Sequence, residues 1–145
     1  LSRDLTKDYP ATVKEVVKYY TQIQNCYYGR ECTDEEIKQL GTKAWELFDL
    51  ELQENNPLDS YLINLQAEII SFKNAGRTMT SSAVAASTNV DYFVDDGFDF
   101  ARIHCGYGFM EKNESKAVRI VYLLRRDADR KWRIYGWDYA ENVNP

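Results

Sequence analysis

The chain has 145 residues and a formal net charge of −5. A chain of this length is the size of one domain and buries enough surface to fold without a metal or disulfide scaffold. The acidic balance disfavours nucleic-acid binding, which needs a basic stripe for phosphate contacts, and charge-driven binding to an anionic membrane. No apolar run approaches the length of a membrane span.

Three helices are expected in the first half of the chain. The first covers residues 12–28, where Thr12 and Glu15 form a capping-box pattern ahead of apolar residues at helical spacing. The second covers residues 33–56 and opens on another capping box, and the third covers residues 57–76. We interpret the apolar stripe of each helix as core packing.

About five strands are expected in the second half. Residues 77–89 are rich in Ser, Thr and Ala and favour an edge strand, with a linker as the alternative. Residues 90–94 predict a short strand and residues 98–112 a long one. The apolar face of the long strand consists of Ala101, Ile103, Cys105, Tyr107 and Phe109.

The segment 117–139, AVRIVYLLRRDADRKWRIYGWDY, predicts a hairpin that closes the chain. Residues 118–124 are apolar on both alternating sets, which is typical of a strand inside a sheet. By the period of two, Trp132, Ile134 and Asp138 fall on one face of the last strand. The other face holds Arg133, Tyr135, Trp137 and Tyr139.

Helices followed by antiparallel strands predict the α+β class, with three N-terminal helices packed on one face of a curved sheet. We expect residues 1–145 to form a single domain, with residues 1–10 as a flexible N-terminal segment. Three Cys are too few for a disulfide framework, and between Cys26 and Cys32 both a local disulfide and two free thiols remain open. With His104 as the one His, a His-based metal site is disfavoured, and no metal or cofactor is expected.

The element order and the ending LLRRDADRKWRIYGWDY, with its Trp132-x-Ile134 strand, resemble the nuclear-transport-factor-2-like superfamily of cystatin-like cones. That superfamily includes ketosteroid isomerase, scytalone dehydratase and the SnoaL-like cyclases. The stretches LFDLELQENNP and YLINLQAEIISFK are similar to a family of extracytoplasmic proteins of gut clostridia whose function is not established. The resemblance implies a conical fold in which the helices lie on the concave face of the sheet and a pocket lies between them. It implies no reaction, because this fold hosts many functions.

One function that this resemblance raises is catalysis on a small hydrophobic substrate. Chemistry like that of ketosteroid isomerase needs a carboxylate base and acidic hydrogen-bond donors in an apolar pocket. If Trp132 points into the cone, so does Asp138, which would then be the base, with Tyr107 or Tyr122 as the donor. The related dehydratases use a His-Asp pair, but His104 falls on the less apolar face of its strand and is expected on the outer surface of the sheet.

The leading hypothesis is a non-catalytic binding or interaction domain. A small apolar ligand would lie in the cone, in a pocket lined by Tyr107, Tyr122, Trp132 and Asp138. Alternatively, a protein partner would bind the outer sheet face, because exposed aromatic residues flanked by Arg are typical of interfaces. That face would present Arg133, Tyr135, Trp137 and Tyr139. Related cone folds often dimerise through the sheet, which makes a homodimer a further expectation.

The location of the protein is also an expectation from the resemblance. The chain starts at Leu1 and opens with the polar stretch LSRDLTKD, so we expect an upstream segment to be missing. In the similar clostridial family a lipoprotein signal precedes this domain. We therefore expect an extracytoplasmic lipoprotein that is tethered to the surface of a Gram-positive bacterium by that signal.

Overall fold

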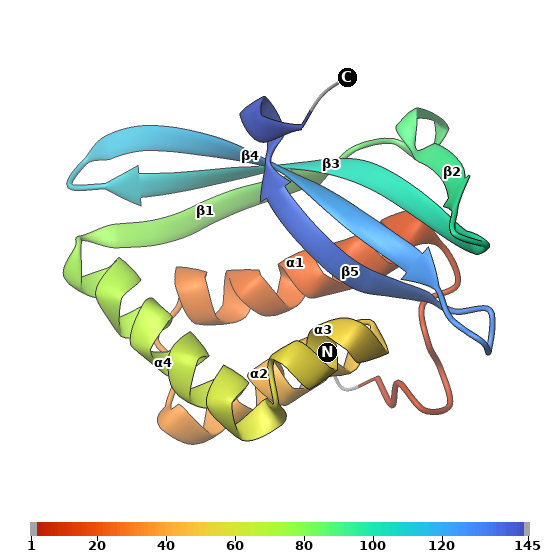
Figure 1. Cartoon of the computed structure of the whole chain (residues 1–145). Coiled ribbons are helices and arrows are strands. Elements are labelled where there is room, and N and C mark those ends of the chain that lie inside the picture. Colours follow the sequence, from red (N-terminus) through yellow and green to blue (C-terminus); the bar gives the residue numbers. More distant parts are fainter. Residues whose placement is uncertain (1–2, 144–145) are drawn as a thin grey trace.

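The computed structural model describes residues 3–143, in which four α-helices are followed by a five-stranded, curved antiparallel sheet (Figure 1). The helices are α1 (Val13–Gly29), α2 (Asp34–Glu46), α3 (Leu50–Asn55) and α4 (Leu58–Asn74). The strands are β1 (Arg77–Val84), β2 (Asp91–Asp95), β3 (Phe98–Glu111), β4 (Glu114–Arg126) and β5 (Trp132–Tyr139). The predicted α+β class is therefore confirmed.

The long strand β3 is the centre of the sheet. Along one edge it pairs with β1 over Cys105–Glu111 and with β2 over Phe98–Arg102. Along the other edge it pairs with β4, which pairs in turn with β5, so the order is β1-β3-β4-β5, and β2 shares with β1 the same edge of β3. The predicted edge strand is confirmed, since β1 pairs only with β3.

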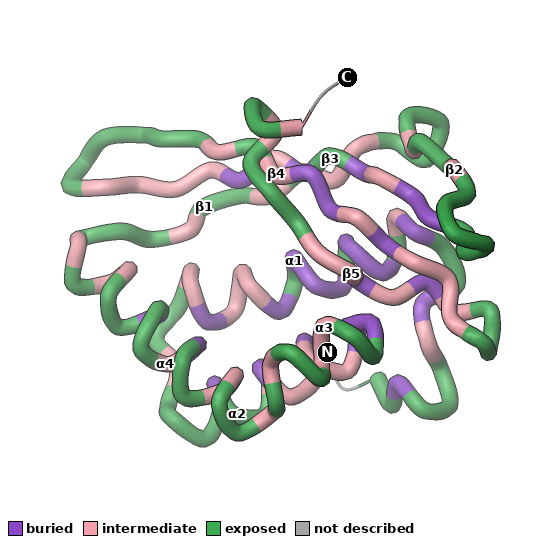
Figure 2. Tube along the Cα trace, in the orientation of Figure 1, coloured by how far each residue is buried: buried purple, intermediate pink, exposed green. Residues whose placement is uncertain are grey.

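The helices cover one face of the sheet, and the core lies between the two layers (Figures 1 and 2). Helix α1 lies directly against the sheet and buries Val16, Val17 and Ile23 completely. The facing strands contribute Ile103 and Leu124, which are equally buried. The apolar face predicted for β3 is thus the face that the helices cover.

The second predicted helix is broken into α2 and α3, which corrects the expectation of three helices. The break is where the chain leaves the helix to pair with the edge of β5. The Ile134 N–H donates to the Leu47 carbonyl at 2.9 Å, and the Asp49 N–H donates to the Ile134 carbonyl at 2.8 Å. The Asp49 side chain then caps α3 by accepting from the Glu51 N–H. A bridge to a strand more than eighty residues away has no local signature, which is why helical periodicity missed it.

Part of the N-terminal segment packs onto the rest of the molecule. Residues 1–2 of the expected flexible segment 1–10 lie outside the described residues. Within residues 3–10, Leu5 is buried and the Tyr9 hydroxyl donates to the Trp132 carbonyl at 2.6 Å. Cys26 and Cys32 are free thiols, and the Cys32 thiol donates to the Cys26 carbonyl at 3.3 Å. Over the described part of the chain, no helix is both long and apolar enough to cross a bilayer.

Candidate ligand-binding pocket

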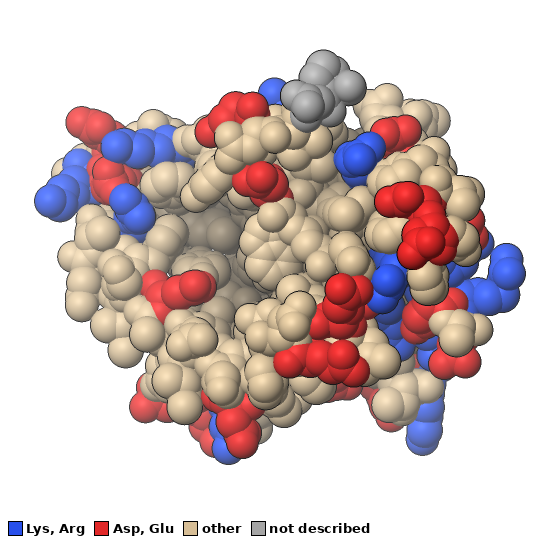
Figure 3. Space-filling view, viewed as in Figure 1, with Lys and Arg blue, Asp and Glu red and all other residues tan. Residues whose placement is uncertain are grey.

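A cavity of about 630 Å³ lies between the helical layer and the sheet. Figure 3 shows it as a hollow left of the centre of the molecule, with mainly uncharged walls. Helices α1, α3 and α4 form one side, and strands β1, β3, β4 and β5 form the other. Seven of its lining residues are tyrosines, namely Tyr20, Tyr27, Tyr28, Tyr61, Tyr107, Tyr122 and Tyr139. The size suits a small organic ligand, because such pockets commonly span several hundred cubic ångströms.

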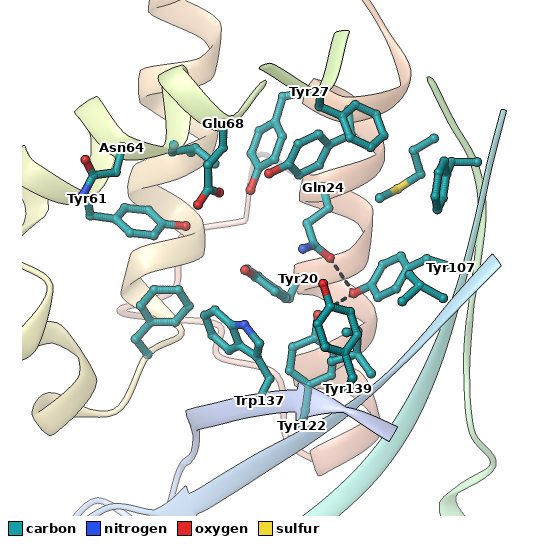
Figure 4. Close-up of a pocket in the computed structure, with 18 of the residues that line it drawn as sticks. Tyr20, Gln24, Tyr27, Tyr61, Asn64, Glu68, Tyr107, Tyr122, Trp137 and Tyr139 are labelled. Carbon is teal, nitrogen blue, oxygen red and sulfur yellow. Dashed lines mark hydrogen bonds between the residues drawn. The ribbon is translucent and has the colours of Figure 1, made fainter. Parts of the chain in front are cut away.

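The helical side of the pocket follows from residue spacing on two helices. In α1, Tyr20, Gln24 and Tyr27 recur at intervals of four and three and therefore share one face. In α4, Tyr61 and Glu68 are two turns apart and also share a face. Figure 4 shows these side chains pointing from both helices into the same space.

The sheet side contributes a pair of tyrosine hydroxyls. The Tyr107 hydroxyl lies 2.6 Å from Gln24 Oε1 and 2.5 Å from the Tyr122 hydroxyl (Figure 4). An amide oxygen only accepts hydrogen bonds, so Tyr107 donates to Gln24 and Tyr122 donates to Tyr107. The three groups form one directed chain, Tyr122 to Tyr107 to Gln24.

Burial raises the pKa of several pocket tyrosines above its ordinary value. Loss of solvent raises the pKa of Tyr107 and Tyr122 well above the ordinary value of a tyrosine. Burial also raises the pKa of Tyr61 to about 12, with the negative charge of Glu68 as the next cause. Burial and the charge of Glu68, in that order, raise the pKa of Tyr28. These hydroxyls therefore stay neutral, and the protons of Tyr107 and Tyr122 are used in the chain to Gln24.

Aromatic rings pack together at the pocket wall. The Tyr20 ring lies 5.7 Å from Tyr122 and 6.2 Å from Trp137, measured between centroids. The Phe48 ring lies 5.7 Å from Trp137 and 5.4 Å from Tyr61. These rings come from α1, the α2–α3 junction, α4 and two strands, so the wall exists only when both layers are in place.

Two formal charges line the pocket, Glu68 on α4 and Arg77 at the start of β1. Arg77 is compensated, because its Nε lies 2.5 Å from the Glu111 carboxylate. Hydrogen bonds from Lys116 and Arg77 lower the pKa of Glu111 to about 2. Among residues 3–143, no salt bridge joins Glu68 to a cation, so Glu68 is the uncompensated charge of the pocket.

A β-bulge reverses the predicted faces of the last strand. Leu124 pairs with Ile134 and Leu123 pairs with Gly136, so Tyr135 is an extra residue in β5. Beyond a bulge, side chains that a strict period of two places on one face appear on the other. Trp137 pairs with Tyr122, and both line the pocket.

Three predictions for this strand are therefore wrong. Trp137 and Tyr139 line the pocket and do not form an outer interface. Asp138 pairs with Val121 on the outer face, where it is exposed and its carboxylate accepts from the Asn142 side chain at 3.1 Å. The structure thus brings Tyr107 and Tyr122 together but places the expected base on the opposite side of the sheet. Gly136 was the available signal, since glycine inside a strand often marks a bulge.

The remaining sequence-predicted residues lie away from the pocket. Trp132 is buried but does not line the cavity. The guanidinium carbon of Arg126 lies over its ring, 4.7 Å from the centroid. Arg133 binds the Asp127 carboxylate and the Glu46 carbonyl, and Tyr135 donates to Glu51, so both side chains are held within the molecule. His104 is exposed on the outer face, as the sequence predicted.

Sequence reasoning missed the residues that the helices supply. Gln24, Tyr61 and Glu68 lie within or beside stripes that were interpreted as core packing. A polar Gln24 between two tyrosines on one helix face was a signal of a solvent-filled space next to that face. Within the described residues, no group of three or more His, Cys, Asp or Glu side chains is placed to hold a metal ion.

Residues 1–137 match the model of a family described as a domain of unknown function, DUF6715. The match covers nearly the whole chain, and the protein belongs to this family. No curated protein matches the chain.

Proposed function

We propose that this protein is a non-catalytic binding domain that takes a small, largely apolar ligand into the pocket between its helices and its sheet. The observation that carries the proposal is the open cavity of about 630 Å³ with aromatic walls and neutral tyrosine hydroxyls. Apolar walls with a few convergent polar groups are typical of small-molecule sites.

The enzyme alternative loses support from the geometry of β5. It needed Asp138 as a base next to Tyr107 or Tyr122, and Asp138 lies on the outer face. The one carboxylate that lines the pocket, Glu68, is exposed to solvent. The carboxylate base of ketosteroid isomerase-like chemistry works in an apolar pocket.

A protein partner on the outer sheet face also loses its expected contacts. Trp137 and Tyr139 point into the pocket, and Arg133 and Tyr135 are bonded within the molecule. We therefore place ligand binding in the cone. The homodimer stays a prediction, and a molecular mass measured by light scattering in solution tests it.

The surface location belongs to the proposal and rests on the resemblance to extracytoplasmic clostridial proteins alone. The complete reading frame tests it. A signal with a cleavage-site Cys upstream of this domain would support tethering, whereas a start without any export signal would contradict it.

Binding of a neutral fluorescent apolar probe, N-phenylnaphthylamine, tests the pocket. Its fluorescence is expected to rise and saturate when the unmodified protein is added. Ile120→Trp fills the cavity from β4, because Ile120 lines it, and is expected to weaken probe binding at least about tenfold. Its control is Arg119→Trp, which places the same ring at the exposed neighbouring position on the other face.

Circular dichroism establishes that both variants are folded. Equal probe affinity for the unmodified protein and for a folded Ile120→Trp variant would show that the probe binds elsewhere. The absence of any saturable signal from the unmodified protein would contradict the proposal directly.

A further inference from the structure

The charge of the pocket restricts the chemistry of its ligand. The Arg77 guanidinium is already ion-paired with Glu111, which also binds Lys116 at 2.8 Å. Glu68 has no cationic partner among residues 3–143, and no other acidic residue lines the cavity. Tyrosine hydroxyls near Glu68 are neutral donors, so they solvate the carboxylate without cancelling its charge. The Glu68 carboxylate is therefore the charge in the cavity that lacks an ion-pair partner within residues 3–143.

Aromatic rings line the space into which that carboxylate projects. In Figure 4, Glu68 and Tyr61 project from α4 toward Tyr20 and Trp137, which come from α1 and β5. The Phe48 ring joins them, at 5.4 Å from Tyr61 and 5.7 Å from Trp137. The face of an aromatic ring attracts a cation, and tryptophan does so most strongly.

From these two features we propose that the ligand carries a small organic ammonium group that lies between Glu68 and the aromatic wall formed by Tyr20, Phe48, Tyr61 and Trp137. This inference rests on the proposed function and names the ligand class of the same pocket. The apolar body of the ligand would extend toward the tyrosine pair of β3 and β4. The net charge of −5 favours approach of a cation as well.

Other ligand charges fit the pocket less well. An anion would be repelled by Glu68 and would find the Arg77 guanidinium already paired. A neutral apolar ligand that covered Glu68 would remove water from a charge without replacing it, which is costly. A cation instead gains from the carboxylate and from the ring faces together.

A matched pair of probes separates charge from shape. Choline carries a trimethylammonium group. Its neutral counterpart of the same shape, in which carbon replaces the quaternary nitrogen, is 3,3-dimethyl-1-butanol, called dimethylbutanol below. Binding is measured on the unmodified protein by the shift of the Trp137 indole resonance, which is assigned from its loss in Trp137→Phe. We expect choline to bind at least about tenfold more tightly than dimethylbutanol.

Two carboxylate variants test the assigned residue. Glu68→Gln keeps the shape of the side chain and is expected to remove most of the preference for choline. Glu54→Gln is the control, because Glu54 is exposed on α3 and does not line the pocket, and it should keep the preference. Added salt should weaken choline binding and leave dimethylbutanol binding unchanged.

Each outcome has a separate meaning. Equal affinity for choline and dimethylbutanol, or a preference that survives Glu68→Gln, would overturn the ammonium inference. If N-phenylnaphthylamine still binds in that case, the proposed binding function stands. If choline, dimethylbutanol and N-phenylnaphthylamine all fail to bind, both the inference and the proposed function fail.

Discussion

At the scale of single residues, the Tyr107 hydroxyl holds the polar centre of the pocket together. It donates to Gln24 and accepts from Tyr122, so it links α1, β3 and β4 through one atom. The sequence placed Tyr107 on the apolar face of its strand, which is confirmed. It gave no sign of Gln24 as the third member, because the partner belongs to a helix eighty-three positions earlier.

The direction of this hydrogen-bond chain predicts unequal effects of two similar substitutions. Tyr122→Phe removes one donor while Tyr107 still donates to Gln24, and should lower the free energy of unfolding by about 1 kcal/mol. Tyr107→Phe leaves the buried Tyr122 hydroxyl and Gln24 without their partner and should cost roughly 2 kcal/mol. Urea unfolding of both variants measures the difference.

The double variant completes this test. The two hydroxyls contact each other, so their substitutions should not be additive. The double variant should lose roughly 0.5–1 kcal/mol less free energy of unfolding than the sum of the losses in Tyr107→Phe and Tyr122→Phe. Tyr139→Phe, at a half-exposed position of the same pocket, is the control and should change stability by less than about 0.5 kcal/mol. Strictly additive single effects would show that the chain does not exist.

At the scale of elements, two short irregularities position the site. The bulge at Tyr135 turns Trp137 and Tyr139 into the pocket and Asp138 out of it. The break between α2 and α3 places Phe48 against Trp137 and Tyr61. The hydrophobic pattern predicted nearly all helix and strand positions, but both irregularities depend on pairing with a distant partner. Local periodicity could not have revealed either one.

Asp49 should be the most sensitive residue of the α2–α3 junction. It is buried, it caps α3, and its carboxylate accepts from Arg125 at 2.7 and 3.0 Å. Asp49→Ala removes the cap and leaves a largely buried guanidinium without its main partner, so a loss of about 3 kcal/mol is expected. The comparison variant is Glu51→Gln, whose exposed carboxylate lies 3.6 Å from the same guanidinium and should cost at most about 1 kcal/mol. Chemical denaturation measures both, and similar losses would refute the role of Asp49.

At the scale of the whole molecule, the helical layer and the sheet (Figure 1) share one core. The pocket lies between the same two layers. The core tyrosines are therefore shielded from ionisation only while the two layers stay together. Burial raises the pKa of Tyr20, Tyr27, Tyr107 and Tyr122 above the ordinary value of 10.0.

This shielding predicts how stability depends on alkaline pH. A raised pKa means that the folded state keeps protons that the unfolded chain loses, so these tyrosines leave the free energy of unfolding unchanged below pH 10.0 and lower it as pH rises above that value. Tyrosinate absorbance should show an exposed fraction that titrates first and a buried fraction that appears only with the loss of circular dichroism. Ionisation of all tyrosines in one step, before unfolding, would contradict the enclosed core.

The sequence by itself determined the class, the order of the elements and the inner face of the long strand, because these follow from local propensity and from periodic burial. It also singled out Tyr107 and Tyr122 as pocket residues. Only the tertiary structure decided the membership of the rest of the pocket. Pairing between β4 and β5 created the bulge that turns Trp137 into the pocket and Asp138 to the outer face. Packing of α4 opposite β5 added Glu68 to the pocket. Both depend on contacts between segments far apart in the chain, which no local pattern encodes.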